Sequence, residues 1–175
     1  MARKARARTG SVERGAGGTA AVAVLMGSDS DLSRLQATLD HLKQLQIPWV
    51  ARVMSAHRTP KEVVEFVESA PEQGIGVFLC AAGGAAHLAG VVAAHTDLPV
   101  IGIPMDNPPL GGLDALLATV QMPGGIPVGT LAVGKAGAKN AGLLAVAILA
   151  RKDPALRERL AAWRKKQSDS VPERP

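Results

Sequence analysis

Short apolar runs alternate with helical segments along residues 21–150, and this alternation restricts the fold more than any other feature. An uninterrupted run such as AVAVLM (21–26) is typical of a strand covered on both faces. The segment after it repeats leucine every three or four residues, as amphipathic helices do. Strands joined by helices form a parallel sheet with right-handed crossovers and helices on both faces. We therefore predict a single three-layer α/β/α domain.

The same pattern sets the expected boundaries of the elements. Strands are predicted at residues 21–26, 49–56, 76–82, 99–104 and 127–133. Helices are predicted at residues 31–45, 60–70, 85–95, 110–120 and 136–150, with an extra, more polar C-terminal helix at 154–166. We place the folded domain at residues 21–167, between an N-terminal extension (1–20) and a C-terminal tail (168–175).

The net charge of +5 belongs to the two ends of the chain. Residues 21–150 carry seven basic and ten acidic side chains, so the predicted domain is mildly acidic. With two Phe, two Trp and no Tyr, the chain also has few aromatic surfaces on which bases could stack. We therefore expect no nucleic-acid partner.

The two ends of the chain and its single cysteine indicate where in the cell the protein is expected. Residues 1–20 lack the apolar core of a secretory signal, and their basic composition weakly resembles a transit peptide. Because glycines interrupt any amphipathic helix there, we predict a disordered basic extension, and a frayed tail at 168–175. No apolar run reaches about 18 residues, so no membrane partner is expected. Cys80 alone forms no intrachain disulfide or cysteine-cluster metal site, which favours the reducing cytoplasm.

Ligands of such folds bind beyond the carboxyl ends of the strands. The first strand ends in GSDSD (27–31), where a glycine permits a sharp turn and Ser28, with exposed N–H groups at a helix start, can hold an anion. Asp31 is a good acceptor for sugar hydroxyls. A phosphate next to a ribose would use both groups. The alternative interpretation is that Ser30 or Asp31 only caps the helix.

The second strand ends in SAHRTP (55–60), where Thr59 and Pro60 have the residue types of a helix start. Arg58 can grip a phosphate with paired donors, and His57 has an ordinary pKa of ~6.5, which suits proton transfer at neutral pH. The alternative is an exposed pair without a function. The position after a buried strand favours a functional role.

The third strand ends in AAGGAAHL (81–88), whose small residues leave the backbone bare. A flat ligand could lie against it, although close packing of helix on sheet also uses small residues. His87 falls in the first turn of the next helix, where the dipole favours a neutral ring. His41 and His95 are assigned solvated or capping roles. The Pro- and Gly-rich segment 104–129 is interpreted as a loop packed over the site or against another subunit.

Four segments, GSDSD, SAHRTP, AGGAAHL and VQMPGGIPVGTLAVGKAGAKNAGLLA, together resemble one family. In order and spacing they are similar to the phosphoribosylaminoimidazole carboxylase catalytic subunit family, and more narrowly to class I N5-carboxyaminoimidazole ribonucleotide mutases. The similarity runs from about Val22 to Gln167. Class II members, which carboxylate aminoimidazole ribonucleotide directly with CO2, carry lysine where Arg58 stands. Gly111 and Ala115 depart from the serines common in relatives.

The resemblance implies a flavodoxin-like fold and a mutase of purine biosynthesis that moves a carboxylate from N5 to C4 of the imidazole, with no cofactor and no metal. It implies a homo-octamer with shared active sites, its C-terminal helices packed between subunits. A functional coupling to the synthetase that makes the N5-carboxylated substrate is a further expectation. Carried over by motif, the catalytic residues are His57 and His87, and the substrate-binding residues are Ser28, Asp31, Ser55, Arg58, Gly83, Gly84 and Ala85.

The chemistry of that reaction sets its own requirements. A carbamate loses CO2 once its nitrogen is protonated, and the electron-rich ring can then attack CO2 through C4. A tight, water-poor pocket would retain the CO2. His57 could give the proton to nitrogen and later accept one from C4. Two alternatives stay open: direct carboxylation by CO2 in the same pocket, and a flavodoxin-like nucleotide-binding module without catalysis.

Overall fold

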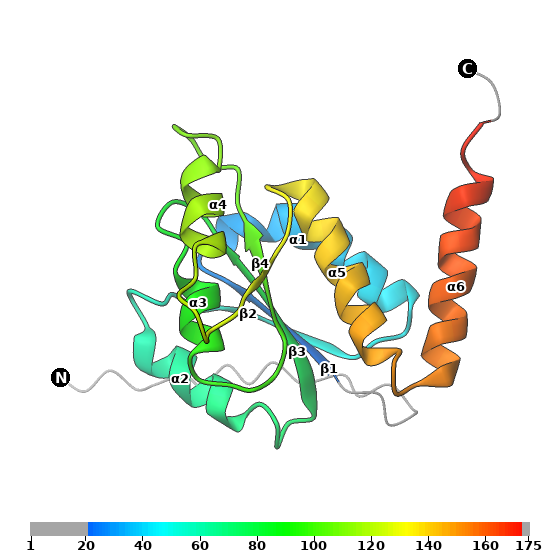
Figure 1. Ribbon diagram of the computed structural model, residues 1–175, viewed down its shortest axis with the longest axis horizontal. Coiled ribbons are helices and arrows are strands. Elements are labelled where there is room, and N and C mark those ends of the chain that lie inside the picture. The colour runs from blue at the N-terminus through cyan, green and yellow to red at the C-terminus, as the bar shows by residue number, and fades with distance from the viewer. Residues whose placement is uncertain (1–20, 173–175) are drawn as a thin grey trace.

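The structure is a computed structural model that describes residues 21–172, which form a five-stranded sheet between two layers of helices (Figure 1). The strand order is β2-β1-β3-β4-β5, and all neighbouring strands are parallel. This is the flavodoxin order, so the predicted fold class is confirmed. The strands are β1 (Ala21–Met26), β2 (Trp49–Val53), β3 (Ile75–Ala82), β4 (Val100–Pro104) and β5 (Gly129–Thr130).

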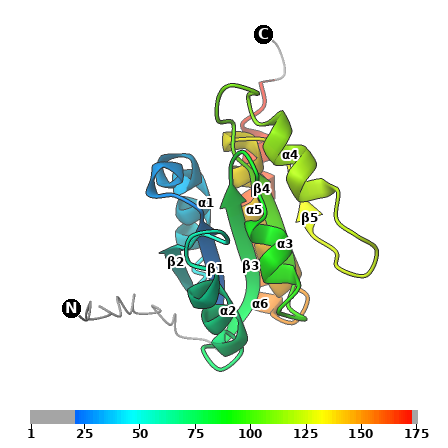
Figure 2. The same cartoon turned by 90° about the vertical axis from the view of Figure 1, so that its left-hand side faces the viewer.

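Helices cover both faces of the sheet (Figure 2). Every residue of β1 is therefore buried, although successive side chains point to opposite sides. Val22 and Val24 face one layer, whereas Ala23 and Leu25 face the other. The first layer holds α1 (Leu32–Gln44) and α5 (Lys135–Leu149), flanked by α6 (Pro154–Asp169). The second holds α2 (Pro60–Ser69), α3 (Leu88–Ala93) and α4 (Leu113–Val120).

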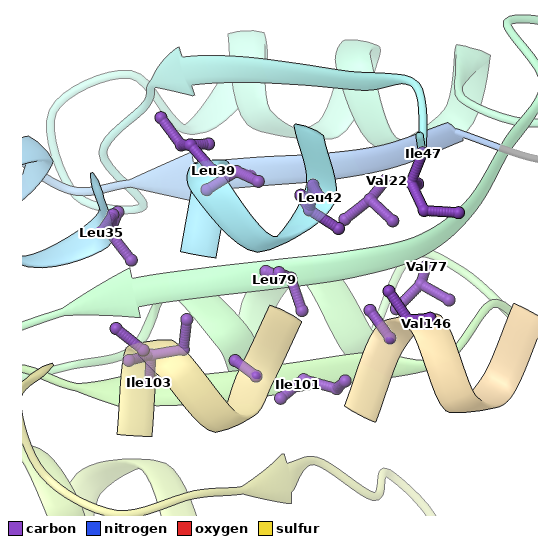
Figure 3. Close-up of a cluster of buried hydrophobic side chains, with 14 of the residues drawn as sticks. Val22, Leu35, Leu39, Leu42, Ile47, Val77, Leu79, Ile101, Ile103 and Val146 are labelled. Carbon is purple, nitrogen blue, oxygen red and sulfur yellow. The ribbon is translucent and has the colours of Figure 1, made fainter. Parts of the chain in front are cut away.

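The larger core lies between the sheet and the first layer, where leucines of α1 pack on valines and isoleucines of three strands (Figure 3). The facing side of α5 is built from alanines and Gly142, so the two helices approach closely. The buried hydroxyl of Thr38 donates a 2.6 Å hydrogen bond to the carbonyl of Ala138 across this contact. Burial on both sides of the central strands therefore fixes the ends of the strands firmly.

Several predicted boundaries are wrong, and two of them have a local reason. Predicted strand 127–133 shrinks to Gly129–Thr130, since Pro127 has no N–H and the chain after Thr130 keeps only scattered bonds to β4. Helix α4 starts at Leu113 and not at residue 110, because Gly111 and Gly112 have φ values of 59° and 90°. The second strand ends at Val53 and not at residue 56, and α3 begins at Leu88 and not at residue 85.

The two ends are only partly covered by the structure. The predicted extension at 1–20 and residues 173–175 lie outside the described residues. Helix α6 continues to Asp169, two residues into the predicted tail, and it leans away from the body beside α5 (Figure 1). Within residues 21–172, no helix has the length and hydropathy needed to cross a membrane.

Candidate active site

The loops after β1, β2 and β3 meet in a cavity of about 340 Å³ at the carboxyl edge of the sheet. β1 lies between the other two strands, so residues from three separate segments reach one place. The predicted residues that line the cavity are Ser28, Asp31, Ser55, His57, Arg58, Gly83, Ala85 and His87. The structure therefore brings together eight of the nine predicted site residues.

The turn after β1 exposes hydroxyl groups at a helix start. Ser28 is the N-cap of the short 3-10 helix Asp29–Asp31, and its hydroxyl accepts hydrogen bonds from the N–H and the hydroxyl of Ser30. α1 begins directly afterwards. Hydroxyls and N–H groups at the start of a helix favour an anion, because the helix dipole is positive there.

Asp31 stands at the same turn and does not cap the helix with its side chain. It is 2% exposed, it lines the cavity, and its Oδ1 atom has no hydrogen-bond partner. Burial raises the pKa of this carboxyl above its ordinary value, with the Arg34 guanidinium and the Ser28 backbone acting in the opposite direction. A buried acceptor without a partner is costly, so the site favours a ligand that donates hydrogen bonds to Asp31.

Residues 55–59 after β2 form a turn closed by Thr59. The Thr59 hydroxyl accepts a hydrogen bond from the Ser55 N–H and donates one to the Ser55 carbonyl, so it does not cap α2 as predicted. Arg58 is anchored at both ends, since its N–H donates to the Ser55 hydroxyl and its Nη2 donates to the Gly27 carbonyl at 2.9 Å. The other guanidinium donors can hold an anion at the Ser28 turn.

The glycines after β3 have different roles. A Cβ on Gly83 would lie 2.1 Å from the Asn107 Nδ2 atom, so only glycine lets that amide pack onto the backbone. Gly84 turns the chain with a φ of 60° and does not line the cavity, in contrast to the prediction. Gly83 therefore serves close approach, and Gly84 serves the turn.

His57 and His87 form a hydrogen bond, with Nε2 of His57 2.8 Å from Nδ1 of His87. Their rings meet edge to face at 84°. Because one proton lies between the two nitrogens, one ring is the donor and the other the acceptor. The first residue comes from the turn after β2 and the second is the N-cap of α3, so the fold joins two histidines 30 residues apart.

Both histidines are exposed in the single chain, as are Arg58 and Ala85. The cavity is therefore an open cleft, and the expected tight, water-poor pocket is not formed by one copy of the chain. The polar groups that line it nevertheless face one another across the ends of three strands.

Sequence reasoning missed Asn107, which lines the cavity from the loop after β4. The pair Asp106-Asn107 follows a buried strand, which is the signal used for the other loops, but the surrounding prolines and glycines obscured it. The QMPGGIP segment (121–127) lines no part of this cavity. Its last residues lie instead beside the start of β4, with Met122 against Gly90 of α3. This part of the predicted segment 104–129 therefore does not pack over the site of its own chain, whereas Asn107, in the same segment, lines it.

Cys80 contributes nothing to the cavity, because it is buried in β3 and burial raises the pKa of its thiol. Across residues 21–172, no three side chains of His, Cys, Asp or Glu gather closely enough to hold a metal ion. The polar groups at the cleft are an arginine, hydroxyls, the Asn107 amide, a buried carboxylate and two hydrogen-bonded imidazoles, a set that suits an anionic, hydroxyl-bearing ligand and proton transfer.

Fold and cleft define an α/β protein with a small-molecule site at the carboxyl edge of its sheet. Residues 21–170 match the family model described as AIR carboxylase, and the chain belongs to this family. It is 54% identical over 154 residues to the N5-carboxyaminoimidazole ribonucleotide mutase of Brucella melitensis, covering 88% of this chain and 95% of the relative.

Further comparisons agree. The N5-carboxyaminoimidazole ribonucleotide mutase of Escherichia coli K12 is 52% identical over 156 residues, which cover 89% of this chain and 92% of that protein. The crystal structure of Treponema denticola PurE matches with a TM-score of 0.76 at 25% identity, covering 86% of this chain and 92% of that chain.

The raised pKa of Asp31 predicts a stabilising substitution. Because the folded carboxyl binds its proton more tightly than the unfolded one, stability falls as the pH rises from 3.8 through the folded pKa. Asp31→Asn removes this cost, so we expect it to raise the free energy of unfolding by about 1 kcal/mol at pH 8. The gain should shrink as the pH falls toward 3.8.

Urea unfolding across this pH range measures the effect, with Asp97→Asn at an exposed position outside the cleft as control. A less stable Asp31→Asn protein at pH 8 would show that the buried carboxylate stabilises the ligand-free fold.

Proposed function

We propose that this protein is an N5-carboxyaminoimidazole ribonucleotide mutase of purine biosynthesis. One observation supports this most directly: two hydrogen-bonded histidines share a cleft with an anchored arginine and a buried carboxylate whose Oδ1 atom has no hydrogen-bond partner. This set matches a ribonucleotide whose phosphate needs a cation, whose ribose needs an acceptor and whose base needs a proton donor. The relatives named N5-carboxyaminoimidazole ribonucleotide mutase, which are 54% and 52% identical to this chain, support the same reaction.

Binding is divided between two sides of the cleft. Arg58 and the Ser28 turn hold the ribose phosphate, since both present donors at a helix start. The Asp31 carboxylate accepts hydrogen bonds from the ribose hydroxyls, which supplies its missing partner. Ser55 keeps Arg58 in place. The Ala85 backbone and the Asn107 amide, which lies over Gly83, line the space in which the flat imidazole lies near the histidines.

The reaction then needs one proton to pass from the enzyme to N5 and another to return to the enzyme from C4. His57 gives a proton to N5, the bond from N5 to the carboxylate carbon breaks, and CO2 is released next to the ring. The C4 carbon attacks CO2 and forms the new carbon–carbon bond. The hydrogen still on C4 passes to His57, which restores the aromatic ring and returns the enzyme to its first state.

The His57–His87 hydrogen bond suits this exchange. When His57 gives up a proton, the shared proton can shift toward it from His87, so the couple stores charge that a single ring would have to carry alone. Because two donors cannot face each other across 2.8 Å, the two rings together hold at most three protons while the bond persists. His87 is thus the partner with which Nε2 of His57 shares a proton.

Two alternatives use the same cleft. A direct carboxylase would take CO2 from solution and would need the same histidine to remove the C4 proton. A nucleotide-binding module without catalysis would need Arg58 and Asp31 but not a pair of coupled imidazoles. The position of Arg58 directly after His57, as in class I members, favours the mutase.

A second copy of the chain supplies the closure that the cleft lacks. The outer face of α4 and the residues before it carry an apolar stripe at a spacing of three and four residues, 49–60% exposed. A groove of about 480 Å³ between α5 and α6 is lined by alanines, a leucine and three arginines. Such surfaces favour self-association, and the octamer implied by the sequence motifs would cover them. The stripe is formed by Leu110, Leu113, Leu117 and Val120.

Replacing His57 separates catalysis from binding. His57→Asn should lower kcat by about a thousandfold, because no other group at the cleft delivers the proton in the same position, whereas Kd for the ribonucleotide should change less than about threefold. Assays of product formation, quenched at set times, measure kcat, and calorimetric titration with the product ribonucleotide measures Kd. His95→Asn, at an exposed histidine outside the cleft, is the matched control. Retention of more than about a tenth of kcat by His57→Asn would contradict the mechanism.

The apolar stripe predicts the assembly state. Leu113→Glu with Leu117→Glu places two charges on that surface, so we expect smaller assemblies by sedimentation velocity and a loss of turnover from the opened cleft. The control is Gln36→Glu with Lys43→Glu on the exposed side of α1, which should leave assembly unchanged. A monomeric wild-type protein would refute self-association.

A further inference from the structure

An ion pair beside the cleft is used by no step above. Arg34 lies in the first turn of α1, and its Nε donates a hydrogen bond to Oδ1 of Asp106, 72 residues further along the chain. The Arg34 side chain is 28% exposed and the Asp106 side chain 45%, so the pair stands at the rim and outside the core. It joins the start of α1 to the loop after β4, across the end of β3.

Asp106 is held from a second side by the start of α5. Gly134, the N-cap residue of α5, has a φ of 71°, and a Cβ there would lie 3.0 Å from the Asp106 carboxyl group. This close approach places a carboxylate at the N-terminal end of a 15-residue helix, where negative charge is favoured. Asp106 is therefore fixed between the first turns of two helices.

Fixing Asp106 fixes Asn107, the next residue. Asn107 lines the cleft, and its side-chain amide packs against the bare backbone of Gly83 in the loop after β3. Two successive side chains thus reach in different directions, one to Arg34 and one to the wall of the cleft. Without the ion pair, the two residues would lose the anchor on the side of α1.

Arg34 also acts on Asp31, three residues before it. Among the charged groups that influence this buried carboxyl, Arg34 is the one that lowers its pKa, while Asp106 and Asp29 raise it and burial raises it most. From other loops, Arg58 and the two histidines line the same cleft. Arg34 therefore favours the ionised form of Asp31, the form that accepts hydrogen bonds from sugar hydroxyls.

We propose that Arg34 and Asp106 form a positioning pair for the ribonucleotide, holding Asn107 at the wall of the cleft and the Asp31 carboxylate ready for the ribose. The inference rests on the proposed function, since it assigns the pair to that ligand. An exposed ion pair contributes little to folding stability, so its loss is expected in ligand binding and not in the fold.

The test compares Arg34→Met, Asp106→Ala and the double variant at pH 8, where ordinary histidines are neutral and carboxylates ionised. Arg34→Met should raise both KM and the calorimetric Kd for 4-carboxy-5-aminoimidazole ribonucleotide about tenfold, with kcat within about twofold of wild type. Asp106→Ala should also raise Kd, but by less than about tenfold, because it frees Asn107 while removing a carboxylate that raises the pKa of Asp31; the double variant should be no worse than Arg34→Met alone. Arg34→Lys keeps the charge and should return Kd to within about threefold of wild type.

Lys165→Met is the matched control, since it removes an exposed ion pair of α6 with Asp169 far along the chain from the cleft. A wild-type protein that neither binds nor converts the ribonucleotide refutes the proposed function itself. If wild type does both, any of three results contradicts the positioning role. The first is a Kd of Arg34→Met within about twofold of wild type, and the second is additive effects in the double variant. The third is a fall in kcat that accompanies a loss of folding stability in Arg34→Met.

Discussion

The parallel register of three strands is the constraint on which the site depends. Met26 at the end of β1 pairs with Val53 of β2 on one side and with Ala81 of β3 on the other. The three strands therefore end at the same level of the sheet, and the loops that follow them begin beside each other. A shift of one register position would turn the buried side chains of a strand to the wrong face. The cleft is thus positioned by the packing of both cores against β1 and β3.

The apolar runs and leucine spacing were enough to predict the layers, the parallel sheet and the edge at which the loops meet. They identified Ser28, Asp31, His57, Arg58 and His87 because each follows a predicted strand. The strand before His57 and Arg58 is the edge strand β2, in which Val50 alone is buried, so burial of that strand was predicted wrongly. Sequence spacing does not predict which side chains touch. The bond between His57 and His87 and the pair of Arg34 with Asp106 depend on how loops from different strands fold together. Local exceptions, such as the glycines before α4 and the proline before β5, moved the predicted boundaries.

The same edge shows why a binding site differs from a core. Asp31 is almost fully buried and has an oxygen without a partner, an arrangement that disfavours folding. The two histidines, in contrast, are exposed to solvent in the single chain. The Asp31 carboxylate is therefore already buried in the single chain, whereas the two histidines are open to solvent. A ligand would supply the partner of Asp31, and a neighbouring copy of the chain would cover the histidines. Function on this fold comes from these few groups, since the sheet itself would support many other ligands.

The central claim is that the carboxylate moves from N5 to C4 within one cleft, without exchange of CO2 with the solution. Its most direct test supplies the ribonucleotide labelled with ¹³C in the N5 carboxylate, in a buffer containing unlabelled bicarbonate and carbonic anhydrase. Mass spectrometry of the product should find the label retained at C4 during early turnover. Product that carries the isotope composition of the buffer would contradict the account and identify a carboxylase that draws CO2 from solution.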